Sequence, residues 1–302
     1  MTYCTISRCN KKIECKDYNL CLVHIKELNS TNFPSTIQLK SPQNLTTHLI
    51  EIPRGTSEFS STEQKFLTDW VKENTQGLRV DAIYNILLPQ SIVANYKTYR
   101  AGVESRGNFK SLGLQEGNEL LLYHGTDHDC AVIYAAVMQR LCKSNNCAGC
   151  GILMNSFNIS KVGINKQGRT FQRLGQGLYF TPFSSKAHFY GHKGAKPHPN
   201  ESGRTCRMMF MTKVVLGKAW QPNRVDQNCR SPPSGFDSTW GRKGNFESLS
   251  LVSKYMYLMS YVDLGTCPHG GAVLNYEEYA VYRHDACLPT KYISYSYTST
   301  NE

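Results

Sequence analysis

The clearest pattern of apolar and polar positions lies in Leu120–Thr126, where three leucines and a tyrosine precede His124-Gly125-Thr126. A short apolar run with a polar end predicts a buried strand whose last side chains reach a cleft, and glycine lets a ligand approach the backbone. Other apolar or alternating stretches predict strands at 48–53, 80–88, 177–181, 207–216, 278–283 and 292–297. Residues 151–157 predict a strand or a tight turn into one, and 231–240 an extended connection.

Apolar residues at helical spacing occur in fewer places. Ser60-Ser-Thr-Glu63 is a capping box and predicts a helix that presents Phe66, Leu67, Trp70 and Val71 on one face. Further helices are predicted at 91–100, 131–141 and 184–190. Because strands dominate after residue 120, with short helices between them, the sequence predicts an α+β fold rather than a doubly wound sheet.

Composition divides the chain into three parts. Residues 1–28 are rich in cysteine, and Cys4, Cys9, Cys21 and His24 could form a tetrahedral zinc site, with Cys15 as a spare ligand. Such a short unit has little apolar core, so the metal would supply its folding energy; the alternative is a set of free thiols. Residues 29–45 predict a linker and 46–302 one larger domain.

A second cysteine group comprises Cys130, Cys142, Cys147 and Cys150. Short spacings in a chain without a signal peptide favour metal binding over disulfides. The group therefore predicts a second structural zinc, with His128 as a substitute ligand; the alternative is four free or buried thiols.

Charge and hydropathy narrow the class of protein. With 40% hydrophobic residues the 302-residue chain is expected to be globular. Its longest apolar run, 130–138, is too short to span a bilayer, and its first residues do not resemble a secretory signal. We therefore expect an intracellular protein of the nucleus or cytoplasm, without a membrane segment. The net charge of +11 comes largely from 155–245, which predicts either a solvated basic surface or contact with nucleic acid or another phosphate-bearing ligand.

Common catalytic motifs are missing from the sequence. There is no phosphate-binding Gly-x4-Gly-Lys-Ser/Thr, no Gly-x-Ser-x-Gly and no His-Glu-x2-His, and 175–177 lacks the third glycine of a dinucleotide fingerprint. What remains is a histidine, a tyrosine and a glutamate on successive predicted strands, with aromatic residues near each. This set suits cleavage of a glycosidic bond, where a carboxylate stabilises developing positive charge and aromatic faces hold a flat leaving group.

Three segments carry a resemblance to a known family: Tyr123-His-Gly-Thr126, Gly175-Gln-Gly-Leu-Tyr-Phe180 and Glu278-Tyr-Ala-Val-Tyr282. In this order they resemble the His-Tyr-Glu motif of poly(ADP-ribose) polymerase-type ADP-ribosyltransferases, and their surroundings are most similar to compact fungal members. The resemblance covers about 50–297. It implies split antiparallel β-sheets with short helices, and NAD as the donor substrate.

The resemblance also implies a role for each matching residue. His124 would bond the 2′-hydroxyl of the nicotinamide ribose, with Thr126 assisting, and the Gly125 backbone would bond the nicotinamide amide. Tyr179 and Tyr190 would stack on the two faces of the nicotinamide. Glu278 would be the catalytic carboxylate, and the loop 158–173 would lie over the donor.

Two positions complicate the match. The family has a serine for the nicotinamide amide where this chain has Ala187, so that Ser184 or Ser185 would have to replace it. Glu277 precedes Glu278, and on a strand the two side chains point to opposite faces. The frame of Tyr279 and Tyr282 selects Glu278.

The sequence therefore predicts transfer of ADP-ribose from NAD to a protein or nucleic-acid acceptor, with single transfer favoured over chain extension. Hydrolysis of NAD is a variant of this reaction. The alternative is a basic, zinc-containing module that binds nucleic acid or ADP-ribosylated targets without catalysis.

Overall fold

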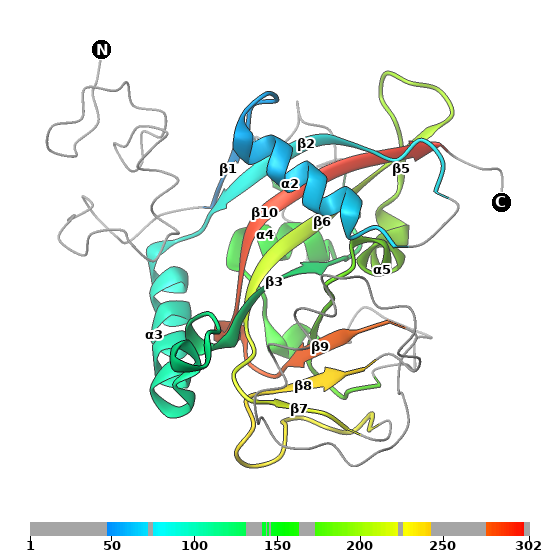
Figure 1. The fold of residues 1–302 in the computed structure, drawn as a ribbon. Coiled ribbons are helices and arrows are strands. Elements are labelled where there is room, and N and C mark those ends of the chain that lie inside the picture. The colour runs from blue at the N-terminus through cyan, green and yellow to red at the C-terminus, as the bar shows by residue number, and fades with distance from the viewer. Residues whose placement is uncertain are drawn as a thin grey trace, which may run out of the picture.

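The computed structural model, shown in Figure 1, describes residues 47–71, 75–130, 141–142, 144, 146–162, 173–222, 226–242 and 276–298. The N-terminal unit with Cys4, Cys9, Cys21 and His24 and the linker 29–45 lie outside these residues. So do nearly all of the helix predicted at 131–141 and most of the loop at 158–173.

The larger sheet is antiparallel throughout and has the order β1-β2-β10-β6-β3, with β5 paired to β6. Its strands are β1 (His48–Glu51), β2 (Arg79–Leu87), β3 (Glu119–His124), β5 (Lys196–Pro197), β6 (Arg204–Val215) and β10 (Cys287–Thr298). Side chains of β6 alternate between its two faces: Met208 and Phe210 pack on one side, Met209 and Met211 on the other. Both faces of the central strands are therefore buried.

The smaller sheet has the order β4-β9-β8-β7. Its strands are β4 (Leu178–Phe180), β7 (Ala219–Trp220), β8 (Ser238–Gly241) and β9 (Glu278–Val281), and the β7–β8 pair is parallel. The two sheets are joined at β3, where the Tyr123 amide donates to the Thr181 carbonyl at 2.8 Å and the Thr181 amide donates back at 3.1 Å. His124 thus ends a strand that pairs with β6 in the larger sheet and also bonds to the residue that follows β4.

Helices cover both faces of the larger sheet. Helices α2 (Ser57–Thr68) and α5 (Ser184–His188) pack on the face that carries Met209, and α3 (Gln90–Gly107) and α4 (Ala148–Asn155) pack on the face that carries Phe210 (Figure 1). Short 3-10 segments lie at Phe109–Leu112, Glu116–Asn118, Ile159–Lys161, Phe189–Gly194 (η5) and His284–Ala286. The α+β class is confirmed. None of the helices in the described ranges is long and apolar enough to cross a membrane.

Helix α2 differs from its predicted form. It begins at Ser57, and Thr56 is its N-cap, whose side chain accepts from the Phe59 amide at 3.2 Å. The predicted start at Ser60 is wrong because several Ser and Thr residues here could cap a helix, and only the tertiary contacts choose among them. Its buried face carries Phe59 and Phe66, whereas Leu67 and Val71 are 40% and 39% exposed.

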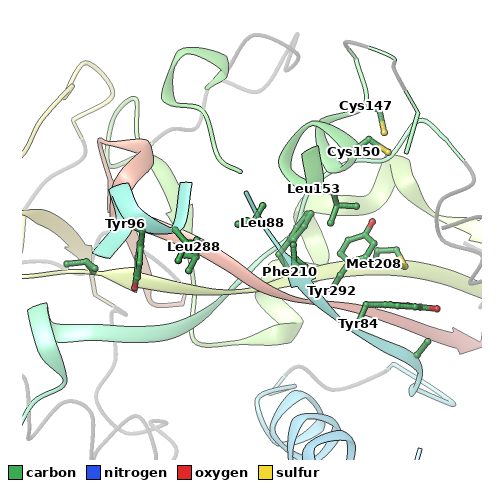
Figure 2. Packing of buried hydrophobic residues seen from close by; sticks show 14 of the residues in the cluster. Tyr84, Leu88, Tyr96, Cys147, Cys150, Leu153, Met208, Phe210, Leu288 and Tyr292 are labelled. Carbon is green, nitrogen blue, oxygen red and sulfur yellow. The ribbon is translucent and has the colours of Figure 1, made fainter. Parts of the chain in front are cut away.

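Residues 151–157 are not a strand. Residues Ala148–Asn155 form α4, whose Cys150 and Leu153 lie in the core beside Phe210 and Tyr292 (Figure 2). A short apolar run fits a buried helix and a buried strand equally well, so the pattern could not separate them. The extended connection predicted at 231–240 ends in β8, which the sequence did not indicate.

A buried ion cluster links α3 to the start of β3. Glu119 accepts from the Tyr96 hydroxyl at 2.6 Å and from Arg100 at 2.8 Å, and Lys213 lies 3.2 Å from it. Burial by itself would raise the pKa of Glu119, but Lys213, Tyr96 and Arg100 together lower it below its usual value. Arg100, only 7% exposed at its side chain, depends on this carboxylate and on Glu116.

We expect Glu119→Gln to lower the free energy of unfolding by about 3–5 kcal/mol at pH 7, because it leaves a buried guanidinium poorly compensated. The folded-state pKa of Glu119 is depressed, so its contribution is present above the unfolded value of about 4.3 and is lost as pH falls through the folded value. Denaturant titrations at neutral and acid pH should show the difference from wild type shrinking toward acid. An equal difference at every pH would contradict this assignment.

Candidate active site

His124 is held at the end of β3 by β4. Its Nδ1 lies 2.8 Å from the main-chain oxygen of Tyr179. Because a carbonyl can only accept, Nδ1 carries the hydrogen, and this fixes the tautomer of a neutral ring with Nε2 as its acceptor.

Aromatic side chains surround the His124 ring. Phe157 meets it edge-on with ring centroids 5.0 Å apart, and Phe180 and Phe210 lie at 5.5 and 6.5 Å. Phe210 is also the β6 residue opposite His124 in the strand register. The orientation of the imidazole is therefore set by packing as well as by its hydrogen bond.

Tyr179 is fixed at both ends. Its main chain pairs with Ala280 of β9, and its hydroxyl donates to the Gly175 carbonyl at 2.7 Å and accepts from the Leu174 amide at 2.9 Å. Burial is the main cause that raises the pKa of Tyr179, so the phenol stays protonated at neutral pH. Tyr179 lies in β4, and the bonds of its hydroxyl fix its ring to the segment that precedes this strand.

Glu278 begins β9 and is 4% exposed. Its Oε1 accepts from the Tyr190 hydroxyl at 2.5 Å and lies 3.2 Å from Nζ of Lys186. Since side chains alternate along a strand, Glu278 shares a face of β9 with Ala280, which pairs with Tyr179. The β4–β9 pairing thus brings Tyr179 and Glu278 to one side of the smaller sheet, and the hydrogen bond to Glu278 adds Tyr190 from η5.

Lys186 was not among the predicted site residues. Besides its ion pair with Glu278, its Nζ lies 5.4 Å from the centroid of the Tyr190 ring. A Lys four residues before Tyr190, at helical spacing, was the available sequence signal. Glu277 differs from its neighbour, since its main-chain oxygen accepts from the Thr181 hydroxyl at 2.8 Å.

Gly125 lies against the backbone of α5. A Cβ at this position would meet the Ala187 carbonyl oxygen at 1.8 Å, so no larger residue fits without a shift of α5. The Ala187 side chain itself packs in the core between α2 and the larger sheet. Thr126 is similarly close to η5, where its carbonyl oxygen lies 2.9 Å from the Cβ position of Gly191.

The two serines proposed to replace the missing family serine bond to the last turn of α2 and to the chain just after it. The Ser184 hydroxyl donates to the Phe66 carbonyl at 2.7 Å, and the Ser185 hydroxyl accepts from the Val71 amide at 3.2 Å. Both side chains are fully buried. They tie α5, and with it Lys186, to α2.

The second cysteine group is assembled in the fold. The sulfurs of Cys130, Cys142, Cys147 and Cys150 all lie within 4.8 Å of one another, with Cys130 at 3.7 Å from Cys147 and 3.4 Å from Cys150. A zinc ion bound to four thiolates at ~2.3 Å requires sulfur–sulfur separations of about 3.8 Å. A disulfide needs ~2.05 Å, so these distances fit a metal site and not a bond between sulfurs.

Protonation within the cysteine group is uneven. The Cys150 thiol and nearby main-chain amides, acting against burial, lower the pKa of Cys147 to about 3, whereas the pKa of Cys150 is raised by Cys147 and by burial. The predicted substitute ligand His128 is fully buried, which lowers its pKa, and its Nε2 contacts the Tyr292 hydroxyl. The four sulfurs therefore form the possible metal site without it.

Two mainly antiparallel sheets that carry a histidine, a tyrosine and a glutamate are the arrangement implied for the ADP-ribosyltransferase class. Residues 56–297 match the family model of the poly(ADP-ribose) polymerase catalytic domain. The chain therefore belongs to this family, and its membership supports ADP-ribosyltransferase activity in general.

A curated relative agrees with this class. The chain is 29% identical over 126 residues to the protein mono-ADP-ribosyltransferase PARP3 of Mus musculus, an alignment that covers 42% of this chain and 18% of the relative. The match thus spans about a fifth of that protein's length. The alternative of a binding module without catalysis receives no support from either match.

Proposed function

We propose that this protein transfers ADP-ribose from NAD to a macromolecular acceptor and releases nicotinamide. The observation that carries the proposal is the hydrogen bond between Tyr190 and Glu278, which couples the second tyrosine of the motif to a buried carboxylate. The β4–β9 pairing adds Tyr179 to the same side of the sheet, and His124 bonds to the backbone of Tyr179. These four residues are the ones that the resemblance implies, namely the His-Tyr-Glu motif and a second tyrosine.

In the proposed reaction the bond between the ribose C1′ and the nicotinamide nitrogen breaks, and its electron pair leaves with nicotinamide, which becomes neutral. Positive charge develops on the ribose, and the Glu278 carboxylate stabilises it. An acceptor atom then bonds to C1′ and loses its proton, with Glu278 as the proposed base. Lys186, 3.2 Å from Glu278, forms an ion pair that holds the carboxylate in place before NAD binds.

The remaining residues are proposed to hold the donor. His124 would bond the ribose 2′-hydroxyl through Nε2, since Nδ1 is engaged by the Tyr179 carbonyl. Tyr179 and Tyr190 would stack on the nicotinamide, and the main chain of Gly125 would bond its amide. Thr126 is proposed as a secondary polar contact to the donor. A donor contact of Ser185 stays a prediction from the sequence, since its side chain is fully buried and accepts from the Val71 amide.

The acceptor is proposed to be a protein or nucleic-acid group, with single transfer favoured. Mono-ADP-ribosylation is what the name of the mouse relative states for that protein, and it supports the same choice here. Chain extension and hydrolysis of NAD by water are outcomes that the same site chemistry allows. Contact of the basic segment 155–245 with nucleic acid stays a prediction. Two of its basic residues, Lys186 and Lys213, form ion pairs within the protein.

Incubation with NAD labelled on the adenine tests the proposal. Wild-type protein should release nicotinamide and retain label on a macromolecule, which mass spectrometry would assign to an acceptor and a chain length. We expect His124→Ala to lower nicotinamide release about 5- to 100-fold, since it leaves the ribose hydroxyl without its partner at a cost of ~1–3 kcal/mol. No nicotinamide release by wild type with any protein or nucleic-acid acceptor would contradict the proposed activity.

We also propose a structural zinc ion bound by Cys130, Cys142, Cys147 and Cys150. The support is the tetrahedral-scale spacing of four sulfurs that lie partly or fully buried. When bound, zinc would hold all four cysteines as thiolates and cross-link the chain between 130 and 150. A second zinc site at Cys4, Cys9, Cys21 and His24 stays a prediction from the sequence.

A further inference from the structure

We propose that the four-cysteine metal site positions His124, so that NAD binding depends on zinc. This inference rests on the proposed function and adds a second role to the cysteines beyond stability. Two routes lead from the sulfurs to the imidazole, one through the segment 125–130 and one through α4.

The first route is the chain itself. Only five residues separate His124 from Cys130, and this segment has no helix or strand of its own. Its first residues lie against α5 and η5, and its second half is attached near the cysteines: the Gly149 amide donates to the Asp127 carbonyl at 3.1 Å, and the Cys130 sulfur lies against Cys147 and Cys150. Fixing Cys130 through zinc therefore fixes the far end of the segment that begins at His124.

His128 strengthens this attachment at the middle of the segment. Its buried ring lies over the first turn of α4, where a Cβ on Gly149 would meet the ring at 1.8 Å. Its Nε2 contacts the Tyr292 hydroxyl of β10, and its ring stacks at 6.4 Å on Phe210, the β6 partner of His124. The segment is thus held against α4 on one side and the larger sheet on the other.

The second route is α4. The helix begins just after Cys147 and includes Cys150, and the chain beyond its end leads to Phe157, whose ring meets the His124 ring edge-on at 5.0 Å. Figure 2 shows Cys147, Cys150 and Leu153 of this element above Phe210 and Tyr292. A shift of α4 would therefore move one wall of the imidazole site.

Helix α4 is unable to hold this position through its own stability. It has eight residues, and its N-cap Cys147 makes no side-chain capping hydrogen bond. Isolated helices of this length are unstable in water, so tertiary anchors decide the placement of α4. Two zinc–thiolate bonds at its first turn would be the strongest of these anchors. Loss of zinc should loosen both routes to His124 at once.

The test compares the full-length wild type with Cys147→Ser/Cys150→Ser. We expect the variant to contain about one zinc ion per chain fewer than wild type by elemental analysis, even if the N-terminal cysteines bind another. We expect its affinity for carba-NAD, which cannot lose nicotinamide by the same route, to fall about 10-fold or more in calorimetry, because misplaced binding groups cost affinity and rate steeply. Cys287→Ser, a buried cysteine that belongs to no group of candidate metal ligands among the described residues, is the matched control and should change neither quantity.

Phe157→Leu separates positioning from folding. This variant keeps all four cysteines, so we expect full zinc content and a several-fold loss of carba-NAD affinity. Unchanged zinc in the double variant would overturn the metal site. The positioning role would be overturned if the double variant lost zinc but kept its affinity for carba-NAD. It would also be overturned if the double variant were unfolded and Phe157→Leu bound carba-NAD as tightly as wild type. A zinc-loaded wild type that neither binds carba-NAD nor turns over NAD would instead contradict the proposed activity.

Discussion

Replacing Glu278 with Gln should lower NAD-dependent nicotinamide release about 10²- to 10³-fold, with little effect on the affinity for NAD. Glutamine is nearly isosteric, and its amide oxygen can still accept the hydrogen bond from Tyr190. What is lost is the negative charge that the developing ribose cation needs. The effect should therefore appear in kcat rather than in KM.

Glu277→Gln is the matched control, because the same chemical change is made one residue away, just before β9 begins. The Glu277 contact with Thr181 is made by its main-chain oxygen, which the substitution retains. Nicotinamide release within a few-fold of wild type is expected for this control. If the two variants lost activity equally, or only Glu277→Gln lost it, the assignment of Glu278 as the catalytic carboxylate would be wrong.

Gly125→Ala should impair the site by a different mechanism, through the packing of α5. The new methyl group would lie 1.8 Å from the Ala187 carbonyl oxygen, so that α5 or the segment after His124 must move. Overpacking of this kind lowers the free energy of unfolding by about 1–3 kcal/mol. Because α5 carries Lys186 and leads to Tyr190, a displacement of the order of 1 Å would also separate these residues from His124, and nicotinamide release should fall about 10²-fold.

Gly102→Ala is the control for this substitution. Gly102 lies inside α3, and a Cβ there would come no closer than 3.7 Å to a neighbouring atom. Because alanine is the better helix former, the control should gain up to ~1 kcal/mol and keep its activity. Thermal or denaturant unfolding measures the stability of both variants. A Gly125→Ala protein with wild-type stability and turnover would show that the contact with Ala187 is not restrictive.

Much of this site could be predicted from short stretches of sequence. The strands that end in His124 and contain Tyr179 are apolar runs with polar or glycine boundaries. Such a pattern can be recognised without knowledge of any tertiary contact. The choice of Glu278 over Glu277 also followed from a local frame. The order of these segments indicated the family before any contact was known, because the family's motif is itself distributed along the chain.

Other features depended on contacts that no local pattern contains. The run 151–157 fits strand and helix equally, and it is a helix because Cys150 and Leu153 face the core beside Phe210. The start of α2 depended on which of several hydroxyl residues capped it. Lys186 acquires its ion pair only because α5 and β9 converge, although Lys186 and Glu278 are 92 residues apart in the chain.

The sequence by itself determined which residues could do chemistry, since a histidine after an apolar strand, two tyrosines and a glutamate are set by local composition. Only the tertiary structure decided which of them meet. It placed the Tyr190 hydroxyl on Glu278, the Tyr179 carbonyl on His124, and four cysteine sulfurs within bonding range of one ion. These pairings arise from strand register and helix packing, in which each contact depends on the rest of the chain and not on its own neighbours in sequence.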